Sequence, residues 1–262
     1  MNYTAYFKLI QTGLLSAYRD RSMLITDLLI ATGVPFFIQF AIWSFAYETN
    51  GADALPQYTL HETYLYYVAV LALNRLNNTY DLIFRVSTNV HEGQLEGILI
   101  KPISYLKYNF FIFAGESILY YIPILLIAIF VIFTEATWSG VTGFVVLSLI
   151  NLPFCFLLGY LLSLATFWLT RPDLVLSLQA ILASVIGGTL LPIAFWPDHL
   201  QPLMQYNPFR LIISGPAEYL LRPSMDLLAE LLCLYVAWFF VMFISCNKIF
   251  KLASNRYVGA GG

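Results

Sequence analysis

The chain has 262 residues, of which 60% are hydrophobic and only 11% are charged, and its mean hydropathy is +0.75. A soluble domain carries about 25% charged residues, so this composition excludes a soluble globular protein and predicts an integral membrane protein. The net charge of −2 lacks the basic excess of a nucleic-acid-binding protein, and no nucleic acid is expected as a partner.

The first 21 residues predict an amphipathic helix. Apolar residues recur there at three- and four-residue spacing, at Tyr3, Phe7, Ile10, Leu14 and Ala17. Such a helix can lie in the membrane interface, with Arg19 and Arg21 near lipid phosphates. An ordinary cytoplasmic helix packed on the protein fits the same pattern, and both interpretations stay open. No short apolar core with a small-residue cleavage site occurs here, so no signal peptide is expected.

Six stretches are long and apolar enough to cross a membrane, which takes roughly 20 residues. They are Leu24–Tyr47, Tyr64–Phe84, Phe110–Phe133, Val141–Trp168, Leu174–Phe195 and Leu227–Phe250. The second is the weakest, because five polar residues interrupt it: Asn74, Arg75, Asn77, Asn78 and Asp81. The sequence therefore predicts an all-α integral membrane fold with six transmembrane helices.

The distribution of lysine and arginine predicts the orientation. Ten of these residues fall on one side of the predicted spans: Lys8, Arg19, Arg21, Arg85, Lys101, Lys107, Arg171, Lys248, Lys251 and Arg256. Only Arg210 and Arg222 fall on the other side, and Arg75 lies within a span. Basic residues favour the cytoplasm, so both termini are expected there.

Polar residues follow one another along the second predicted span. Asn74, Asn78, Asp81 and Arg85 are spaced by four, three and four residues and would form one stripe, in which Asp81 and Arg85 can pair. The stripe is either a seam between helices or part of a substrate path, and we favour the seam. Arg75 lies off the stripe, and we expect it to pair with Glu116 of the third span.

Residues 187–226, between the last two spans, are rich in proline. Six of the chain's 12 prolines lie there, at Pro192, Pro197, Pro202, Pro208, Pro216 and Pro223. This density breaks helices into short pieces, yet the stretch stays apolar. We expect short exterior re-entrant helices before the last span, covered by protein or open to a water-filled cavity.

The cytoplasmic loop of residues 87–107 predicts a short amphipathic helix. Ser87 or Thr88 would cap it, and Pro102 would end it near Ile100. Its apolar edge is Leu95, Ile98 and Leu99, and its polar face is His91, Glu92, Gln94 and Glu96. From the residues alone, docking of a soluble partner and rest on lipid headgroups are both open.

The run GQLEGILIKPISYLKY, from Gly93 to Tyr108, resembles the GxLexxLlkPlsyl signature of small bacterial ABC exporter permeases of the type-2 class, often called drug or viologen permeases. The exterior segment Leu191–Phe209 resembles the proline-bearing hairpin that precedes the last span in that family. The ending NRYVGAGG, Asn255–Gly262, resembles its C-terminus. The similarity extends over essentially the whole chain.

This resemblance implies one permease domain over residues 1–262, in the bacterial inner membrane, working in efflux. Its coupling helix would sit in a groove of a separate cytoplasmic ABC ATPase dimer. A second copy or a related permease would complete the translocation path, and membrane lipid would surround the permease dimer. The coupling positions carried over from the motif are Glu92, Gly93, Leu95, Glu96, Leu99, Lys101 and Pro102.

The chain itself is not expected to be an enzyme. It has no G-x-x-x-x-G-K-[ST] phosphate loop, so ATP and magnesium are expected on the partner, with no cofactor here. The three cysteines, Cys155, Cys233 and Cys246, have no metal or redox spacing and are expected to be packing residues. Two alternatives remain: an ion-coupled transporter using Asp81 and Glu116, and a membrane-embedded enzyme, for which no HExxH or GxSxG pattern is present.

Overall fold

The structure is a computed structural model that describes residues 3–19, 21–50, 58–76, 79–134 and 138–255. All regular secondary structure in these ranges is helical, which confirms the predicted all-α class. In chain order the elements are α1 (Tyr3–Arg19), α2 (Arg21–Asn50), α3 (Leu60–Leu76), α4 (Tyr80–His91), α5 (Leu95–Leu99), α6 (Tyr105–Ser117), η2 (Ile118–Tyr120), α7 (Tyr121–Thr134), α8 (Trp138–Ser163), η3 (Leu164–Phe167), α9 (Pro172–Ile186), η4 (Ile193–Phe195), α10 (Gln201–Tyr206), α11 (Pro208–Ile212), α12 (Ser214–Leu221) and α13 (Met225–Ser254).

Two helices among the described residues are long and apolar enough to cross a membrane on their own. They are Trp138–Phe167, which joins α8 to η3, and Met225–Ser254, which is α13. These contain the fourth and sixth expected spans. The first expected span lies within α2, and the third is divided among α6, the 3-10 turn η2 and α7.

The second and fifth expected spans differ from the structure. The second is not one helix, because α3 ends at Leu76 and α4 begins at Tyr80. Thr79, just before α4, has a non-helical backbone, and its hydroxyl donates to the side-chain oxygen of Gln179 in α9 at 2.6 Å. The fifth was expected to reach Phe195, but α9 ends at Ile186. Gly188 follows with φ of 90°, a left-handed conformation that glycine adopts without steric cost.

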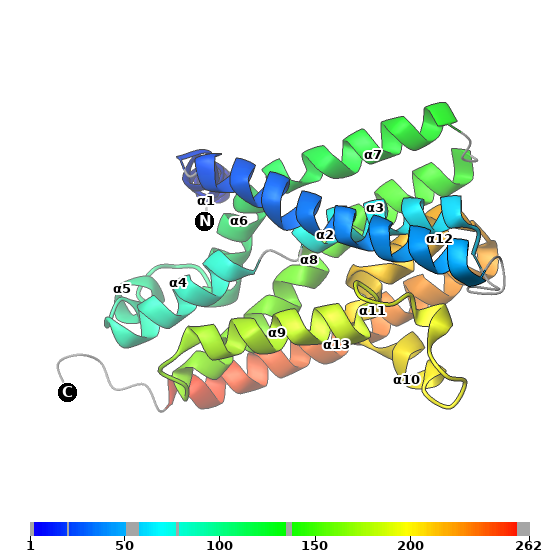
Figure 1. Cartoon of the computed structure of the whole chain (residues 1–262). Coiled ribbons are helices and arrows are strands. Elements are labelled where there is room, and N and C mark those ends of the chain that lie inside the picture. The colour runs from blue at the N-terminus through cyan, green and yellow to red at the C-terminus, as the bar shows by residue number, and fades with distance from the viewer. Residues whose placement is uncertain (1–2, 20, 51–57, 77–78, 135–137, 256–262) are drawn as a thin grey trace.

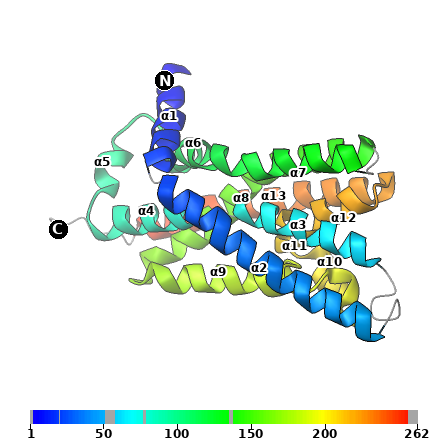
Figure 2. The same cartoon turned by 45° about the horizontal axis from the view of Figure 1, so that its top comes forward.

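The core forms around α8, which packs against α3, α4, α6, α7, α9, α12 and α13. Figures 1 and 2 show it running through the middle of the bundle. Its fully buried aromatic rings include Phe144, Phe154 and Tyr160. The buried Asn151 donates to the carbonyl of Ile212 at 3.0 Å and accepts from the hydroxyl of Tyr235 at 2.8 Å. One amide therefore joins α8, α11 and α13.

Several helices, α2 and α13 among them, present apolar side chains outward. On α2, Leu29, Phe37 and Phe45 are all exposed, and on α13 Val236 and Phe240 are exposed. Apolar surface this extensive marks contact with lipid or with another protein. The same helices use their other faces to contact the bundle.

The N-terminal helix packs on the protein. Gly13 of α1 and Gly115 of α6 lie at the crossing of the two helices. A methyl group on Gly13 would collide with the carbonyl of Ile112, and one on Gly115 with that of Ile10. The helix is therefore confirmed, and its packed face includes Gly13, while Phe7 of the predicted apolar stripe is exposed.

The two ends of the bundle carry different elements. Figure 1 places α1, α4, α5 and the last turns of α13 at one end, and α10 and α12 at the other. The proline-rich segment does break into short pieces, as predicted: η4, α10, α11 and α12.

Candidate functional site

The chain between α4 and α6 forms a tight helical hairpin. Helix α4 continues to His91, and α5 begins at Leu95 after Gly93, whose φ of 74° is left-handed. The predicted cap at Ser87 or Thr88 is wrong, because both residues lie inside α4. Helix α4 continues without interruption past both residues, and the chain reverses its direction at Gly93.

Two apolar side chains anchor this hairpin in the bundle. Leu95 is fully buried and Ile98 is nearly so, and both belong to the hydrophobic core. Their three-residue spacing puts them on the same face of α5. At the far end of the hairpin, the hydroxyl of Ser104 accepts a hydrogen bond from the backbone N–H of Lys107 and caps α6.

The outer face of the hairpin has an apolar tip beside carboxylates. Ile100 directly follows α5 with 85% of its surface exposed, and Leu99 next to it is also exposed. Of the positions carried over from the family motif, Gly93 makes the turn and Leu95 is in the core. The others lie on the surface: Glu92, Glu96, Leu99, Lys101 and Pro102. Ile100 was not among the residues expected here, because its exposure depends on how α5 is rotated against the bundle.

Polar side chains bind α4 to α6 behind this hairpin. Arg85 donates to both carboxylate oxygens of Glu116, at 2.5 and 3.3 Å, and its Nε donates to Asn109 at 3.2 Å. Nearer the hairpin, the Asn89 amide donates to the hydroxyl of Tyr105 at 2.9 Å. We call these five residues the brace. It makes α4 and α6 one unit with α5 at its tip.

The brace corrects one expectation. Glu116 was expected to pair with Arg75, but Arg85 binds its carboxylate, because α4 lies beside α6 at that level. The sequence also allowed a pair between Arg85 and Asp81, and Arg85 donates to Glu116 and Asn109. The single polar stripe is also divided, since Asn74 belongs to α3 while Asp81 and Arg85 belong to α4. Asn78 lies outside the described residues.

Among the described residues, the cysteines and the side chains that could bind metal form no second candidate site. Cys155 and Cys246 are buried, in agreement with a packing role, whereas Cys233 is exposed on α13. Within the part of the chain that the structure describes, no group of three His, Cys, Asp or Glu side chains could hold a metal ion.

The family is decided by a comparison with family models. A model described as an ABC-2 family transporter protein matches residues 32–261, which include the hairpin, the brace and the proline-rich segment. The chain belongs to the ABC-2 transporter family. It is therefore a membrane protein of the permease type, a transmembrane subunit that is not itself catalytic. No individual curated protein matches it.

Proposed function

We propose that this ABC-2 protein is the transmembrane subunit of an ATP-driven exporter, coupled through the α4–α5–α6 hairpin to a separate ATPase. The observation that carries the proposal is the exposed Leu99–Ile100 tip at one end of a membrane bundle of this family. An apolar tip flanked by Glu92 and Glu96 suits a groove with an apolar floor and a basic rim.

The proposed topology has six spans with both termini in the cytoplasm. The spans are α2, α3 with α4, α6 with α7, α8 with η3, α9, and α13. Basic residues support the orientation, because Lys101, Arg171 and Lys248 belong to segments expected at the cytoplasmic side. The short helices of residues 187–226 would lie at the exterior. The protein would work in the bacterial inner membrane as a dimer with a second copy or a related permease.

The brace would transmit force from α5 to α4 and α6. Closure of an ATPase dimer would displace α5, and the ion pair between Arg85 and Glu116 would make α4 and α6 follow together. Helix α1 would move with them, since the Gly13–Gly115 crossing leaves no space for the two helices to slide freely. A rigid group of α1, α4, α5 and α6 is what a rocking, alternating-access mechanism needs.

Helix α1 would also contact lipid. Phe7, Leu15 and Tyr18 are exposed on the side that does not pack against α6. An apolar surface on a helix that ends in Arg19 suits the membrane interface. The two early interpretations of this helix are thus combined, with one face on the protein and the other toward lipid.

The test is co-purification with the ATPase from the native membrane, using Ile100→Asp. We expect this charge at the tip to abolish retention of the ATPase and ATP hydrolysis by the complex. The matched control is Leu203→Asp, which places the same charge at another exposed apolar residue, on α10, and should leave both unchanged. Retention of the ATPase by Ile100→Asp would refute the coupling site. A chain that transports without any ATPase would support the ion-coupled alternative instead.

A further inference from the structure

A cavity of about 230 Å³, open to the outside, is lined by η4, α10, α11, α12, the first turn of α13 and Tyr58, which precedes α3. One wall is held rigidly by Arg210, which is only 4% exposed. Its guanidinium donates to Glu218 of α12 at 2.9 Å, to Glu230 of α13 at 2.7 Å and to the carbonyl of Gln205 at 3.0 Å. This wall joins four helices through contacts of 2.7 to 3.0 Å that centre on the buried Arg210, so we take it as the more rigid wall.

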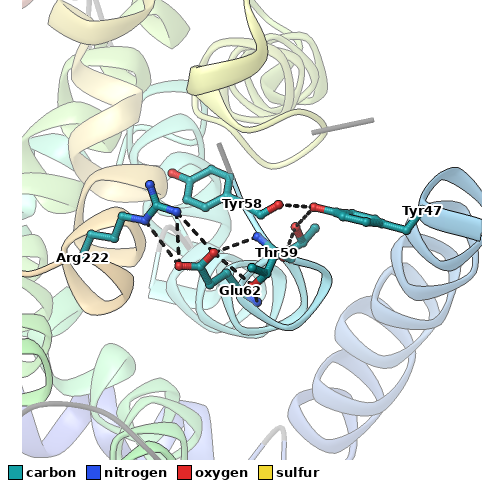
Figure 3. A network of polar contacts seen from close by, with 6 residues as sticks. Tyr47, Tyr58, Thr59, Glu62 and Arg222 are labelled. Atoms are coloured by element: carbon teal, nitrogen blue, oxygen red, sulfur yellow. Dashed lines mark hydrogen bonds and ion pairs between the residues drawn. The ribbon is translucent and has the colours of Figure 1, made fainter. Parts of the chain in front are cut away.

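The opposite wall is held by a looser contact. Arg222, at the end of α12, reaches Glu62 in the first turn of α3 with N–O distances of 3.3 to 3.4 Å. The side chains of this pair are 56% and 26% exposed. The same guanidinium lies over the ring of Tyr58, 5.1 Å from its centroid. Tyr58 and Arg222 both line the cavity, and Figure 3 shows them facing each other.

Tyr58 is connected to the outer helix α2. The Tyr47 hydroxyl at the end of α2 donates to the carbonyl of Tyr58 and lies 3.3 Å from the hydroxyl of Thr63. Burial, followed by the charge of Glu218, raises the pKa of Tyr58 to about 12, so its phenol stays protonated and neutral. A displacement of α2 would therefore draw a neutral aromatic ring away from Arg222.

Helix α3 is also attached to the segment that follows α9. Tyr66 donates to the carbonyl of Gly188 at 2.9 Å, and Tyr67 to that of Leu190 at 3.1 Å. Helix α12 is also fixed, because the ring of Tyr219 fills the space beside Gly143 of α8. These contacts are buried or partly buried and the Arg222–Glu62 contact is exposed, so we expect separation to start at that ion pair.

We propose that Tyr58, Glu62 and Arg222 form a latch that restricts the opening of this cavity, and that the opening widens when the Arg222–Glu62 ion pair breaks. A useful latch must be breakable. Exposed ion pairs meet that condition, since each favours the paired state by no more than about fivefold. The proposal of a latch rests only on the positions and contacts of these three residues. Its role as the exterior exit of the transport path rests on the proposed function.

Glu62 allows a sharp test because its carboxylate has two separable roles. It accepts the backbone N–H of Thr59 at 2.7 Å, while the Thr59 hydroxyl accepts the backbone N–H of Glu62 at 3.2 Å. This is a capping box, in which glutamine can replace glutamate. Glu62→Gln therefore removes the charge that Arg222 needs and keeps the helix cap.

The experiment measures access to the cavity in the purified full-length protein at one fixed pH. In a Cys233→Ser background, which removes the exposed native thiol, Gln205→Cys reports from the cavity wall and Leu203→Cys from the outside surface. The probe is a bulky charged maleimide. We expect Glu62→Gln to accelerate labelling of Gln205→Cys by two- to fivefold (about the strength of the pair), with no change at Leu203→Cys.

A double-variant comparison then isolates the pair. Arg222→Gln should accelerate labelling at least as much as Glu62→Gln, because it also removes the contact with Tyr58. The double variant should be no faster than Arg222→Gln alone. Unchanged labelling in Glu62→Gln overturns the latch, as does equal acceleration at Leu203→Cys or independent, multiplying effects in the double variant. Loss of ATPase binding, by contrast, bears only on the proposed function.

Discussion

Replacing Glu116 with alanine tests the brace that makes α4 and α6 one unit. The change leaves Arg85 without its carboxylate partner, in a place where the two side chains are only 18% and 10% exposed. Removing one partner of a buried pair costs about 3–5 kcal/mol. Because Arg85 keeps its bond to Asn109, we expect the lower end, about 3 kcal/mol. For a chain of this size this corresponds to a fall in Tm of roughly 6–12 °C.

The assay is thermal unfolding of the purified protein in detergent, with two comparisons. Glu96→Ala removes an exposed carboxylate from α5 and should leave Tm unchanged. The double variant Arg85→Met/Glu116→Leu replaces both charges with apolar groups and should melt within a few degrees of the native protein, above Glu116→Ala. If Glu116→Ala had the same Tm as Glu96→Ala, the brace would contribute nothing to stability. The proposed transmission of force from α5 would then be refuted as well.

Three further predictions concern other parts of the bundle. Gly115→Ala should destabilise the protein by about 1–3 kcal/mol, because the methyl group meets the backbone of α1. Gly33→Ala in α2, which has open space around it, should be neutral or stabilising in the same melting assay. Arg210→Ala should lower Tm strongly, since it leaves the buried Glu218 unpaired, whereas Arg210→Lys should lower it less. Finally, burial raises the pKa of Glu62, but bonds from Thr59 and the charge of Arg222 outweigh it and hold the pKa below 4.5. The stabilisation that this shift provides is present above pH 4.5 and is lost as the pH falls through the lowered value. The Tm difference between the native protein and Glu62→Gln should therefore be constant from pH 8 to pH 5 and vanish in stronger acid. A difference that vanished already at pH 6 would contradict this assignment.

Composition and periodicity were sufficient to predict the all-α class, although the second and fifth expected spans do not form single helices of the expected length. An apolar chain in contact with lipid favours helices, since a helix gives each backbone group a partner inside its own segment. The proline spacing in residues 187–226 was enough to predict short helices, because proline cannot continue a helix. The Gly93–Tyr108 run also located the hairpin, where a glycine and a proline delimit an amphipathic turn.

The identity of contacting partners was not available from the same signals. The polar residues of the second span were correctly recognised as unusual, but their regular spacing suggested one stripe, and the helix break between Leu76 and Tyr80 divides it. Glu116 was expected to pair with Arg75, and only the position of α4 beside α6 brings Arg85 to its carboxylate instead. Similarly, Leu95 and Leu99 looked equivalent on one apolar edge until the rotation of α5 buried the first and exposed the second.

The sequence by itself therefore determined what kind of protein this is: a helical membrane protein of the ABC-2 transporter family, with a short helical hairpin between α4 and α6 and short, proline-broken helices in residues 187–226. These properties depend on the chemistry of residues close together in the chain. The tertiary structure alone decided which charges pair, which face of α1 packs, and how Tyr58, Glu62 and Arg222 meet across 160 residues. Those contacts depend on the packing angle and axial level of separate helices, which no local pattern encodes.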